Sequence, residues 1–255
     1  MSSLIDVIIL FGGNSTQAEL DRAVQSVYGL GNIHLIQTGH TVPQLKNGVG
    51  EIHTIAFQGD FADLRNKAER YCKGSHVFFL DADEWISREF QEELRSLIMS
   101  HPSHAISMKR QDRFLGRWLL HGETASVQLV RVYPNKKQHE QAWKGSVHEY
   151  WSGGAAVQSM KHRLFHEPHK NITSFLTKID HYTSIVPIET LLLTLLKLLM
   201  FPIGKFIWNV LILQGFKDGY PGFIMAYIMS LHSLIVRIKH LEQHFCHNKT
   251  HGISR

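Results

Sequence analysis

Cysteine is nearly absent from this chain of 255 residues, and the two cysteines that occur, Cys72 and Cys246, lie far apart. Their positions fit neither the ligand spacing of a zinc site nor a disulfide framework. Few cysteines, spaced for neither disulfides nor zinc, are typical of proteins in a reducing compartment. We therefore expect an intracellular protein that does not depend on disulfide bonds.

The chain also lacks blocks of basic residues. Lys and Arg outnumber Asp and Glu by 27 to 22, which gives a formal charge of +5 and a pI of about 9.2. This modest excess favours anionic partners such as a nucleotide, a phosphorylated glycan or acidic lipid headgroups. Because no basic block or alternation of aromatic and basic residues accompanies it, nucleic acid is not a predicted partner.

A secretory signal is not apparent either. Residues 1–10 have no basic segment followed by a long apolar core, and Asp6 interrupts their apolar run, so we expect a first strand there. The length of the chain is enough for one substantial core, or for one domain with an appendage.

From residue 4 to about 110, apolar strands alternate with helical patterns. Strands are predicted at 4–11, 33–36, 52–57 and 77–80, with apolar residues at helical spacing between them and after the last. Alternation of this kind predicts an α/β fold, in which helices cover both faces of a mainly parallel, Rossmann-like sheet.

Composition divides the chain into three parts. Residues 1–184 are predicted to form the α/β domain, with a nucleotide-binding half at 1–103 and an acceptor-binding half at 104–184 that is rich in His, Arg and Trp. Residues 185–240 are predicted to be an apolar helical extension, and 241–255 a polar tail.

The apolar extension is not an uninterrupted membrane span. Glu189, Lys197, Pro202 and Lys205 interrupt it, and Pro202 is expected to break the helix near its middle. The apolar run at 222–236 has the length of a buried or interfacial helix. We favour helices that lie in the plane of a membrane surface; an ordinary helical subdomain and a spanning hairpin stay open.

The most informative stretch is an apolar strand that stops at two carboxylates. The run 76–80 is followed directly by Asp81-Ala82-Asp83-Glu84. In open α/β sheets, ligands bind beyond the carboxyl ends of such strands. Hard oxygen donors at that place suit Mg²⁺ or Mn²⁺ shared with substrate phosphates. Asp83, with Asp81 directly or through water, is therefore predicted to hold a cation that bridges a diphosphate.

Several blocks, in their order and spacing, resemble a known family. They are the strand with Asp81-Ala82-Asp83-Glu84-Trp85, then Arg113-Phe114-Leu115-Gly116-Arg117-Trp118, Val147-His148-Glu149-Tyr150, Leu164-Phe165-His166 and Gly215-Phe216-Lys217-Asp218-Gly219-Tyr220-Pro221-Gly222. These blocks look like those of the family 2 glycosyltransferases, specifically the small lipopolysaccharide-core β-1,4-glucosyltransferase branch. The resemblance covers nearly the whole chain, from Leu4 to about Ile238.

The resemblance implies a GT-A fold, a nucleotide-sugar donor and inversion at the anomeric carbon. It implies a metal-dependent hexosyltransferase that moves glucose from UDP-glucose to the inner core of lipopolysaccharide. Such an enzyme would work as a peripheral protein on the cytoplasmic face of a bacterial inner membrane. Two alternatives stay open: transfer to another surface glycan or lipid-linked sugar, and a catalytically impaired protein that binds nucleotide sugars.

The first two strands depart from the family pattern. The first usually ends in Pro-x-Tyr-Asn-Glu, whereas Phe11-Gly12-Gly13-Asn14 stands here. The second usually ends in an Asp that contacts the base, and Gln37 takes its place; its amide can still bond a uracil edge because it both donates and accepts. Arg65 and Asn66 match a family pair, so the predicted donor-binding residues are Gln37, Arg65, Asn66 and Asp81.

An inverting transfer needs a base within hydrogen-bond reach of the acceptor hydroxyl. Glu149, Asp112 and Glu123 are the candidates. Glu149 ranks first because it lies in a matching block, and Asp112 second, because its neighbour Arg113 favours a structural carboxylate. A capping or ion-pairing role for Glu149 stays open.

The 18 histidines include one group with metal-like spacing, His162, His166 and His169. The Glu167-Pro168 step disfavours the continuous helix that this spacing would need. His166 alone, in a block that matches the family, is predicted as a third metal or phosphate contact. Three tryptophans are candidates either for sugar-stacking platforms or for the core: Trp118, Trp143 and Trp151.

Overall fold

The structure is a computed structural model of the whole chain, and it describes residues 4–12, 15–39, 43–45, 50–135, 143–145, 149–168, 172–184, 186 and 188–250. Five positions that the sequence patterns single out lie outside the described residues: Gly13, Asn14, Val147, His148 and His169. The chain forms two compact units. The first unit comprises Met1–Gln111 and Val127–Glu167, and the second comprises Asp112–Ser126 and Pro168–Arg255.

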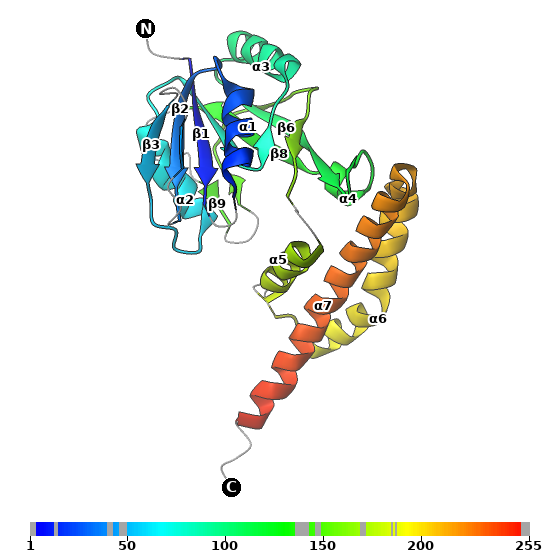
Figure 1. Cartoon of the computed structure of the whole chain (residues 1–255). Helices are drawn as coiled ribbons and strands as arrows, with labels where there is room; N and C mark the ends of the chain where they lie inside the picture. Colours follow the sequence, from blue (N-terminus) through cyan, green and yellow to red (C-terminus); the bar gives the residue numbers. More distant parts are fainter. Residues whose placement is uncertain are drawn as a thin grey trace. The chain divides into compact units, whose positions relative to one another are not determined.

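The first unit is built on a mixed sheet (Figure 1). Its strands are β1 (Ile5–Phe11), β2 (Asn32–Gln37), β3 (Glu51–Thr54), β4 (His76–Asp81), β5 (Glu84–Trp85), β6 (Ala105–Phe114), β8 (Gln128–Pro134), β11 (Val157–Ser159) and β12 (Leu164–His166). The order is β3-β2-β1-β4-β8-β6-β12-β5, and β11 pairs with β6. The β3, β2, β1 and β4 strands are parallel to one another, whereas β8 is antiparallel to both β4 and β6.

Helices cover both faces of this sheet because the central strands are apolar on both sides. Helices α1 (Gln17–Val27) and α3 (Arg88–Ser100) pack on one face. Helix α2 (Phe61–Ala68), the 3₁₀ turn η2 (Glu69–Tyr71) and the short ladder of β9 (Trp143–Lys144) and β10 (Tyr150–Trp151) pack on the other. This arrangement confirms the predicted α/β fold.

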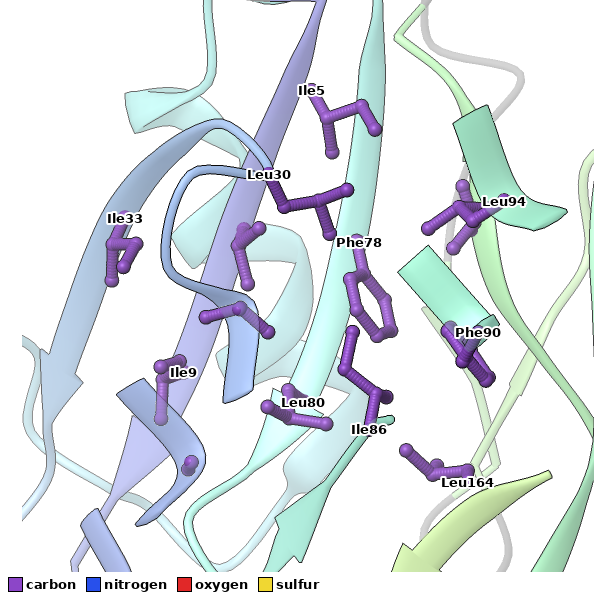
Figure 2. Packing of buried hydrophobic residues seen from close by; sticks show 14 of the residues in the cluster. Ile5, Ile9, Leu30, Ile33, Phe78, Leu80, Ile86, Phe90, Leu94 and Leu164 are labelled. Atoms are coloured by element: carbon purple, nitrogen blue, oxygen red, sulfur yellow. The ribbon is translucent and has the colours of Figure 1, made fainter. Parts of the chain in front are cut away.

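Alternation along each strand decides which residues meet which helices. In β1, Ile5 and Ile9 belong to the cluster on the α1 and α3 face, whereas Ile8 belongs to the cluster on the α2 face. Figure 2 shows Phe90 of α3 near Phe78 of β4, and their rings stack with centroids 6.1 Å apart. Each such fully buried apolar side chain stabilises the fold by about 1.5–3 kcal/mol.

The helices begin where the sequence supplies caps. The Thr16 hydroxyl accepts from the backbone N–H of Glu19, and the Glu19 carboxylate accepts from the backbone N–H of Thr16 at 2.7 Å, which is a capping box at the start of α1. Asp60 caps α2 and Ser87 caps α3 through side-chain oxygens. These caps fix the first residues of the helices that follow β1, β3 and β5.

The second unit is mostly helical. Its elements are β7 (Arg117–Trp118), α4 (Gly122–Ala125), α5 (Ile172–Ser184), α6 (Leu191–Ile207), the π-helical turn η3 (Trp208–Ile212), the 3₁₀ turn η4 (Gly215–Asp218) and α7 (Tyr220–Thr250). Helices α6 and α7 form a hairpin and lie side by side (Figure 1). The last three residues of β6 belong to this unit, and two of them, Arg113 and Phe114, pair with β7.

The helix hairpin differs from its sequence prediction in two ways. The expected break at Pro202 is wrong, because α6 runs through that residue. Proline removes one backbone donor from a helix, and here the Pro202 carbonyl also accepts from the Ser230 hydroxyl of α7 at 2.6 Å. Helix α7 continues to Thr250, into the stretch for which the sequence predicts a polar tail.

Two helical stretches are long and apolar enough to cross a membrane by length and composition alone. They are Leu191–Ile212, with 22 residues, and Tyr220–Phe245, with 26 residues. In the first stretch only 11% of the apolar window is buried, against 39% in the second. The first helix therefore presents most of its apolar surface outside the packed core of its unit.

Candidate active site at the end of β4

The acidic corner predicted from sequence lies at the carboxyl end of β4. Asp81 is the last residue of this strand and pairs in register with Leu10 of β1, whose carbonyl accepts from the backbone N–H of Ala82 at 3.1 Å. The chain runs from β1 outward through β2 and β3, and then returns to place β4 on the other side of β1. The corner therefore lies beside a topological switch point, where open α/β sheets bind ligands.

Two buried arginines hold the Asp81 carboxylate. Nη2 of Arg65, from α2, lies 3.1 Å from Oδ1, and Nη2 of Arg131, from β8, lies 3.0 Å from Oδ2. Burial by itself would raise the pKa of Asp81, but the positive charges of Arg65 and Arg131 outweigh it and hold that pKa well below its usual range. Asp81 is therefore ionised, and both its oxygens have a guanidinium partner.

Glu84 shares Arg131 with Asp81. Its Oε1 lies 3.1 Å from Arg131 Nη2, and its Oε2 accepts from the backbone N–H of Asp81 at 3.0 Å. The Glu84 side chain is fully buried, and burial raises its pKa, although the charge of Arg131 opposes the shift. Glu84 thus fixes the turn between β4 and β5 rather than facing a substrate.

Arg65 joins this corner to the candidate base. The same Nη2 that contacts Asp81 lies 3.1 Å from Oε1 of Glu149. The guanidinium lies over the rings of Trp143, at 4.8 Å, and Phe79, at 5.1 Å. Among the described residues, Nε and Nη1 of Arg65 have no hydrogen-bond partner. A buried cation with unsatisfied donors at this place suits an anionic ligand.

Asp83 and His166 face each other across the turn. The antiparallel pairing of β5 with β12 places His166 opposite Glu84, and His166 Nε2 lies 3.6 Å from Asp83 Oδ2. This separation exceeds a hydrogen bond and leaves room for a shared cation. A carboxylate and an imidazole fit Mn²⁺ as donors, and the carboxylate alone fits Mg²⁺. The residues present therefore fit the divalent cation that the corner was predicted to bind.

Comparison with known proteins identifies the type of domain. Residues 38–164 match the family described as Glycosyl transferase family 2. This part of the chain is therefore similar to glycosyl transferases of family 2. Its mostly parallel sheet between helices is the GT-A-like fold that the sequence resemblance implied, whereas the lipopolysaccharide-core branch is a finer assignment that this match does not make.

Solved structures of S. aureus TarS are similar to the chain. The crystal structure of TarS 1-349 aligns with a TM-score of 0.44 and 12% identity, over 92% of this chain and 81% of that chain. The same fragment in complex with UDP-GlcNAc gives 0.44 and 11%, over 92% and 82%. A longer TarS structure gives 0.44 and 12%, over 90% of this chain and 49% of that one.

The match to the transferase family begins one residue after Gln37, at the end of β2. The strands in which the sequence departs from the family pattern therefore precede the matched range. Gln37 is buried, and its amide donates to the carbonyl of Gly39 at 3.0 Å. Its predicted contact with the donor base stays a prediction.

Asn66 is the second predicted donor-binding residue of α2, and its side-chain amide is hydrogen-bonded to the backbone of β9. Its Nδ2 donates to the carbonyl of Trp143 at 3.1 Å, and its Oδ1 accepts from the Trp143 N–H at 2.8 Å. This pair of bonds ties β9 to α2 beside Arg65. Asn66 therefore has a structural role in the first unit, and its predicted contact with the donor stays a prediction.

The three candidate bases are divided between the units. Glu149 belongs to the first unit, beside Arg65, whereas Asp112 and Glu123 belong to the second. Asp112 is buried, and Glu123 lies 2.7 Å from Lys205 Nζ of α6. Glu149 is thus the candidate that lies in the same unit as the acidic corner.

Two of the three candidate tryptophans are core residues of the first unit. Trp143 and Trp151 are buried, Trp151 stacks on Tyr133 with centroids 5.0 Å apart, and Trp143 donates its indole N–H to the Tyr133 hydroxyl at 2.9 Å. The alternative that these two belong to the core is therefore the correct one. Trp118 is half-buried in the second unit, where Arg113 lies over its ring.

Sequence reasoning missed Arg131 altogether. One signal was present: a lone arginine inside the apolar strand Leu129-Val130-Arg131-Val132-Tyr133 requires an acidic partner if the strand is buried. The identity of that partner depends on the pairing of β8 with β4, two strands that are remote in sequence. The pairing could not be obtained from local patterns.

Proposed function

We propose that the chain is an inverting glycosyltransferase that moves a hexose from a UDP-linked donor, with UDP-glucose as the first candidate, to the inner core of lipopolysaccharide. The observation that carries the proposal is the corner of Asp81 and Asp83 at the switch point, with His166 opposite Asp83. The family match supports glycosyl transfer, and the sequence resemblance supports the acceptor and the inversion.

The first part of the mechanism is recognition of the donor diphosphate. Asp83 and His166 would hold Mg²⁺ or Mn²⁺, which supplies positive charge to the diphosphate as it leaves. Arg65 and Arg131 keep Asp81 ionised and fixed, so that the corner is preorganised before the donor arrives. The unsatisfied donors of Arg65 lie next to the same corner.

The second part is removal of the proton from the acceptor hydroxyl. Glu149 is the residue proposed for this role, because it is the candidate base within the first unit. Its side chain is about one-fifth exposed, at 21%, so a hydroxyl can approach it. The ion pair with Arg65 holds this carboxylate in place, and ion pairing is also the alternative role that the sequence leaves open for Glu149.

We further propose that the second unit binds a membrane surface, peripherally and on the cytoplasmic face, where a lipid-linked acceptor is found. Large apolar side chains along α6 are exposed, among them Leu192 at 70%, Leu199 at 74% and Ile203 at 65%. The lysines of this helix are paired, Lys197 with Glu189 and Lys205 with Glu123. Apolar burial rather than lysine attraction would therefore drive binding.

The decisive experiment measures release of UDP from purified full-length protein with Mn²⁺, truncated lipopolysaccharide and a panel of UDP-hexoses that includes UDP-glucose and UDP-GlcNAc. Transfer should require acceptor and metal, and Asp83→Ala should abolish it while the circular dichroism spectrum is unchanged. Asp63→Ala, which removes a surface carboxylate paired with Lys67 at 2.6 Å, is the matched control and should retain activity.

The outcomes separate the rival functions. Binding of a UDP-sugar without turnover on any acceptor would identify a nucleotide-sugar-binding protein and overturn the enzymatic proposal. Turnover on a lipid-linked sugar or another glycan, and none on lipopolysaccharide, would retain the transferase and replace its acceptor. Full activity of Asp83→Ala would remove the metal assignment.

A further inference from the structure

A second group of metal-ligating side chains lies at the other end of the parallel strands. His34 belongs to β2, and Glu51 and His53 belong to β3, where Glu51 is the first residue of the strand. The parallel register pairs His34 with Glu51 and Ile36 with His53, so all three side chains gather at one edge of the sheet. None of these residues has a role in the proposed transfer reaction.

The donor atoms form a nearly regular triangle. Nδ1 of His34 lies 3.2 Å from Nε2 of His53, and Oε2 of Glu51 lies 3.8 Å from the first nitrogen and 3.6 Å from the second. Ligands about 2.0–2.1 Å from a tetrahedral zinc ion are about 3.3–3.4 Å apart. The distances from the Glu51 carboxylate to the two imidazole nitrogens are too long for hydrogen bonds. A cation bound by all three side chains would account for the three distances.

Neighbouring groups hold the two imidazoles in place. The remaining nitrogen of His34 faces Oδ1 of the fully buried Asp6 at 3.8 Å. Asp6 in turn accepts hydrogen bonds from Asn32 Nδ2, at 2.8 Å, and from the backbone N–H groups of Lys73 and Gly74. Carboxylates placed behind a ligating histidine orient its ring and raise its affinity for a metal.

The ionisation states are also suitable. Although burial alone would raise the pKa of Asp6, its contacts with His34, Gly74, Asn32 and Lys73 lower that pKa to about 2, so Asp6 is ionised. Burial, and then the neighbouring His34, lower the pKa of His53, while Glu51 opposes the shift. A neutral imidazole is the form that binds a metal. The His53 ring is further fixed by stacking on Tyr71, with centroids 3.7 Å apart.

The group formed by His34, Glu51 and His53 lies next to a cavity. A cavity of about 450 Å³ is lined by Asp6, His34 and Glu51 together with Tyr71 and Lys73. The Glu51 side chain is 72% exposed. Two of the three proposed ligands, His34 and Glu51, line this cavity, so a fourth position is open to water or a small anion, and Lys73 adds a positive charge to the cavity lining.

We propose that His34, Glu51 and His53 bind a transition metal ion that prefers imidazole, with Zn²⁺ as the first candidate. This site is separate from the corner at Asp83, which favours Mg²⁺ or Mn²⁺. The ion would tie β3, a four-residue strand at the edge of the sheet, to β2, and so stabilise the side of the sheet next to Gln37. The inference is independent of the sugar, the acceptor and turnover.

The test is a titration of chelator-treated, full-length protein with Co²⁺ and with Zn²⁺. Co²⁺ should give the visible absorption of a tetrahedral complex at one equivalent, and Zn²⁺ should displace it and raise the melting temperature. Glu51→Gln, at an exposed position, and His53→Gln should each weaken binding at least about tenfold. His101→Gln, which removes one ring of a different histidine pair, should leave the titration unchanged.

Two results would overturn the proposal. One is the absence of saturable Co²⁺ or Zn²⁺ binding by the wild-type protein. The other is binding of equal affinity in the wild type, Glu51→Gln and His53→Gln, which would place the metal at other histidines. Because Glu51 is exposed, the Glu51→Gln variant is expected to fold even if substitution of the more buried His53 reduces stability.

Discussion

Arg131 and Glu84 form an ion pair in the interior of the first unit, with Nη2 3.1 Å from Oε1 and side-chain exposures of 6% and 0%. The same Nη2 lies 3.0 Å from Oδ2 of Asp81. One buried cation therefore serves the carboxylate at the end of β4 and the carboxylate that begins β5. A charge left in the interior without its partner costs more free energy than the intact pair gains.

Arg131→Met should therefore lower the free energy of unfolding by about 3–5 kcal/mol, because Glu84 and Asp81 then lose their shared partner. Urea denaturation at neutral pH measures the change. Arg88→Met is the control, since Arg88 is 88% exposed and pairs with Glu92 on the surface of α3. The urea midpoint of this variant should be almost the same as that of the wild type. A loss below about 1 kcal/mol for Arg131→Met would show that the buried pair is dispensable.

Glu149→Gln tests the proposed base. Gln keeps an oxygen that can accept from Arg65 but cannot take up a proton, so kcat should fall by about 10²- to 10⁴-fold while KM for the donor changes little. Glu123→Gln, in the second unit, should retain activity. If Glu123→Gln lost activity and Glu149→Gln kept it, the two assignments would have to be exchanged.

Local patterns were sufficient for the nucleotide half of the fold. The continuous apolar run of β1 and the apolar stripes of α1 and α3 indicate which residues are buried, and the structure has each predicted strand within a few residues of its prediction. The carboxylates at the end of β4 were found because a buried strand that stops at charged residues is itself a local signal.

Contacts that depend on the pairing of strands remote in sequence could not be predicted from local patterns. Arg131 meets Glu84 because β8 runs antiparallel to β4, and His34 meets Glu51 because β3 joins β2 in one particular parallel register. A shift of one residue would turn each of these side chains to the opposite face. The sequence identifies the residue types, but the register decides which of them become partners.

Glu69 should make stability depend on pH. Burial raises its pKa to about 7, although hydrogen bonds from Tyr133 and Trp143 oppose the shift. Because the folded state holds this proton more tightly than the unfolded state, the stabilisation is complete below about pH 4.5 and is lost as the pH rises towards 7. The loss is at most about 3 kcal/mol, at 1.36 kcal/mol per pKa unit.

The measurement is a series of urea titrations between pH 5 and 8 on the wild type and Glu69→Gln. Gln can still accept the Tyr133 hydroxyl and carries no charge, so the two proteins should be similar at pH 5 and the variant more stable at pH 8. Comparison of the two proteins removes the contribution of other titrating groups. Parallel curves for wild type and variant would contradict the assignment.

Exposed leucines and isoleucines of α6 should control membrane binding. Leu199→Asn and Ile203→Asn should each weaken sedimentation with anionic vesicles about tenfold or more, because burying one such side chain in an apolar phase gains about 1.5–3 kcal/mol. Lys217→Asn, which changes a surface residue bonded to Gln214 at 2.6 Å, should have a smaller effect.

Point substitutions are preferable to deletion of the helices. Residues 112–126 pack with the C-terminal helices, where His121 Nδ1 lies 2.7 Å from Asp218 Oδ1 and Glu123 pairs with Lys205. Deletion would remove these partners as well as the exposed apolar side chains of α6. Unchanged sedimentation of Leu199→Asn and Ile203→Asn would contradict the membrane proposal and favour an ordinary helical subdomain.

The turn between α6 and α7 should not tolerate a side chain at Gly222. A Cβ at this position would lie 2.1 Å from the carbonyl oxygen of Gly215 and 2.8 Å from Cβ of Asp218. Asp218 accepts from the backbone N–H groups of Leu120, at 2.9 Å, and His121, at 2.8 Å, so a displaced Asp218 would also release residues 120–121. The glycines in this block of the sequence thus have a steric reason.

Gly222→Ala is accordingly expected to destabilise the second unit by about 1–3 kcal/mol through overpacking. Gly204→Ala is the matched control, because Gly204 lies within α6 and a Cβ there would meet nothing within 4 Å; it should stabilise the helix by about 0.5–1 kcal/mol. Limited proteolysis across the helix hairpin, in mild detergent, should show faster cleavage for Gly222→Ala and slower cleavage for Gly204→Ala. Equal cleavage rates for both variants would mean that the turn can open enough to admit a methyl group, and the close approach of Gly222 to Gly215 would then have no part in holding α6 against α7.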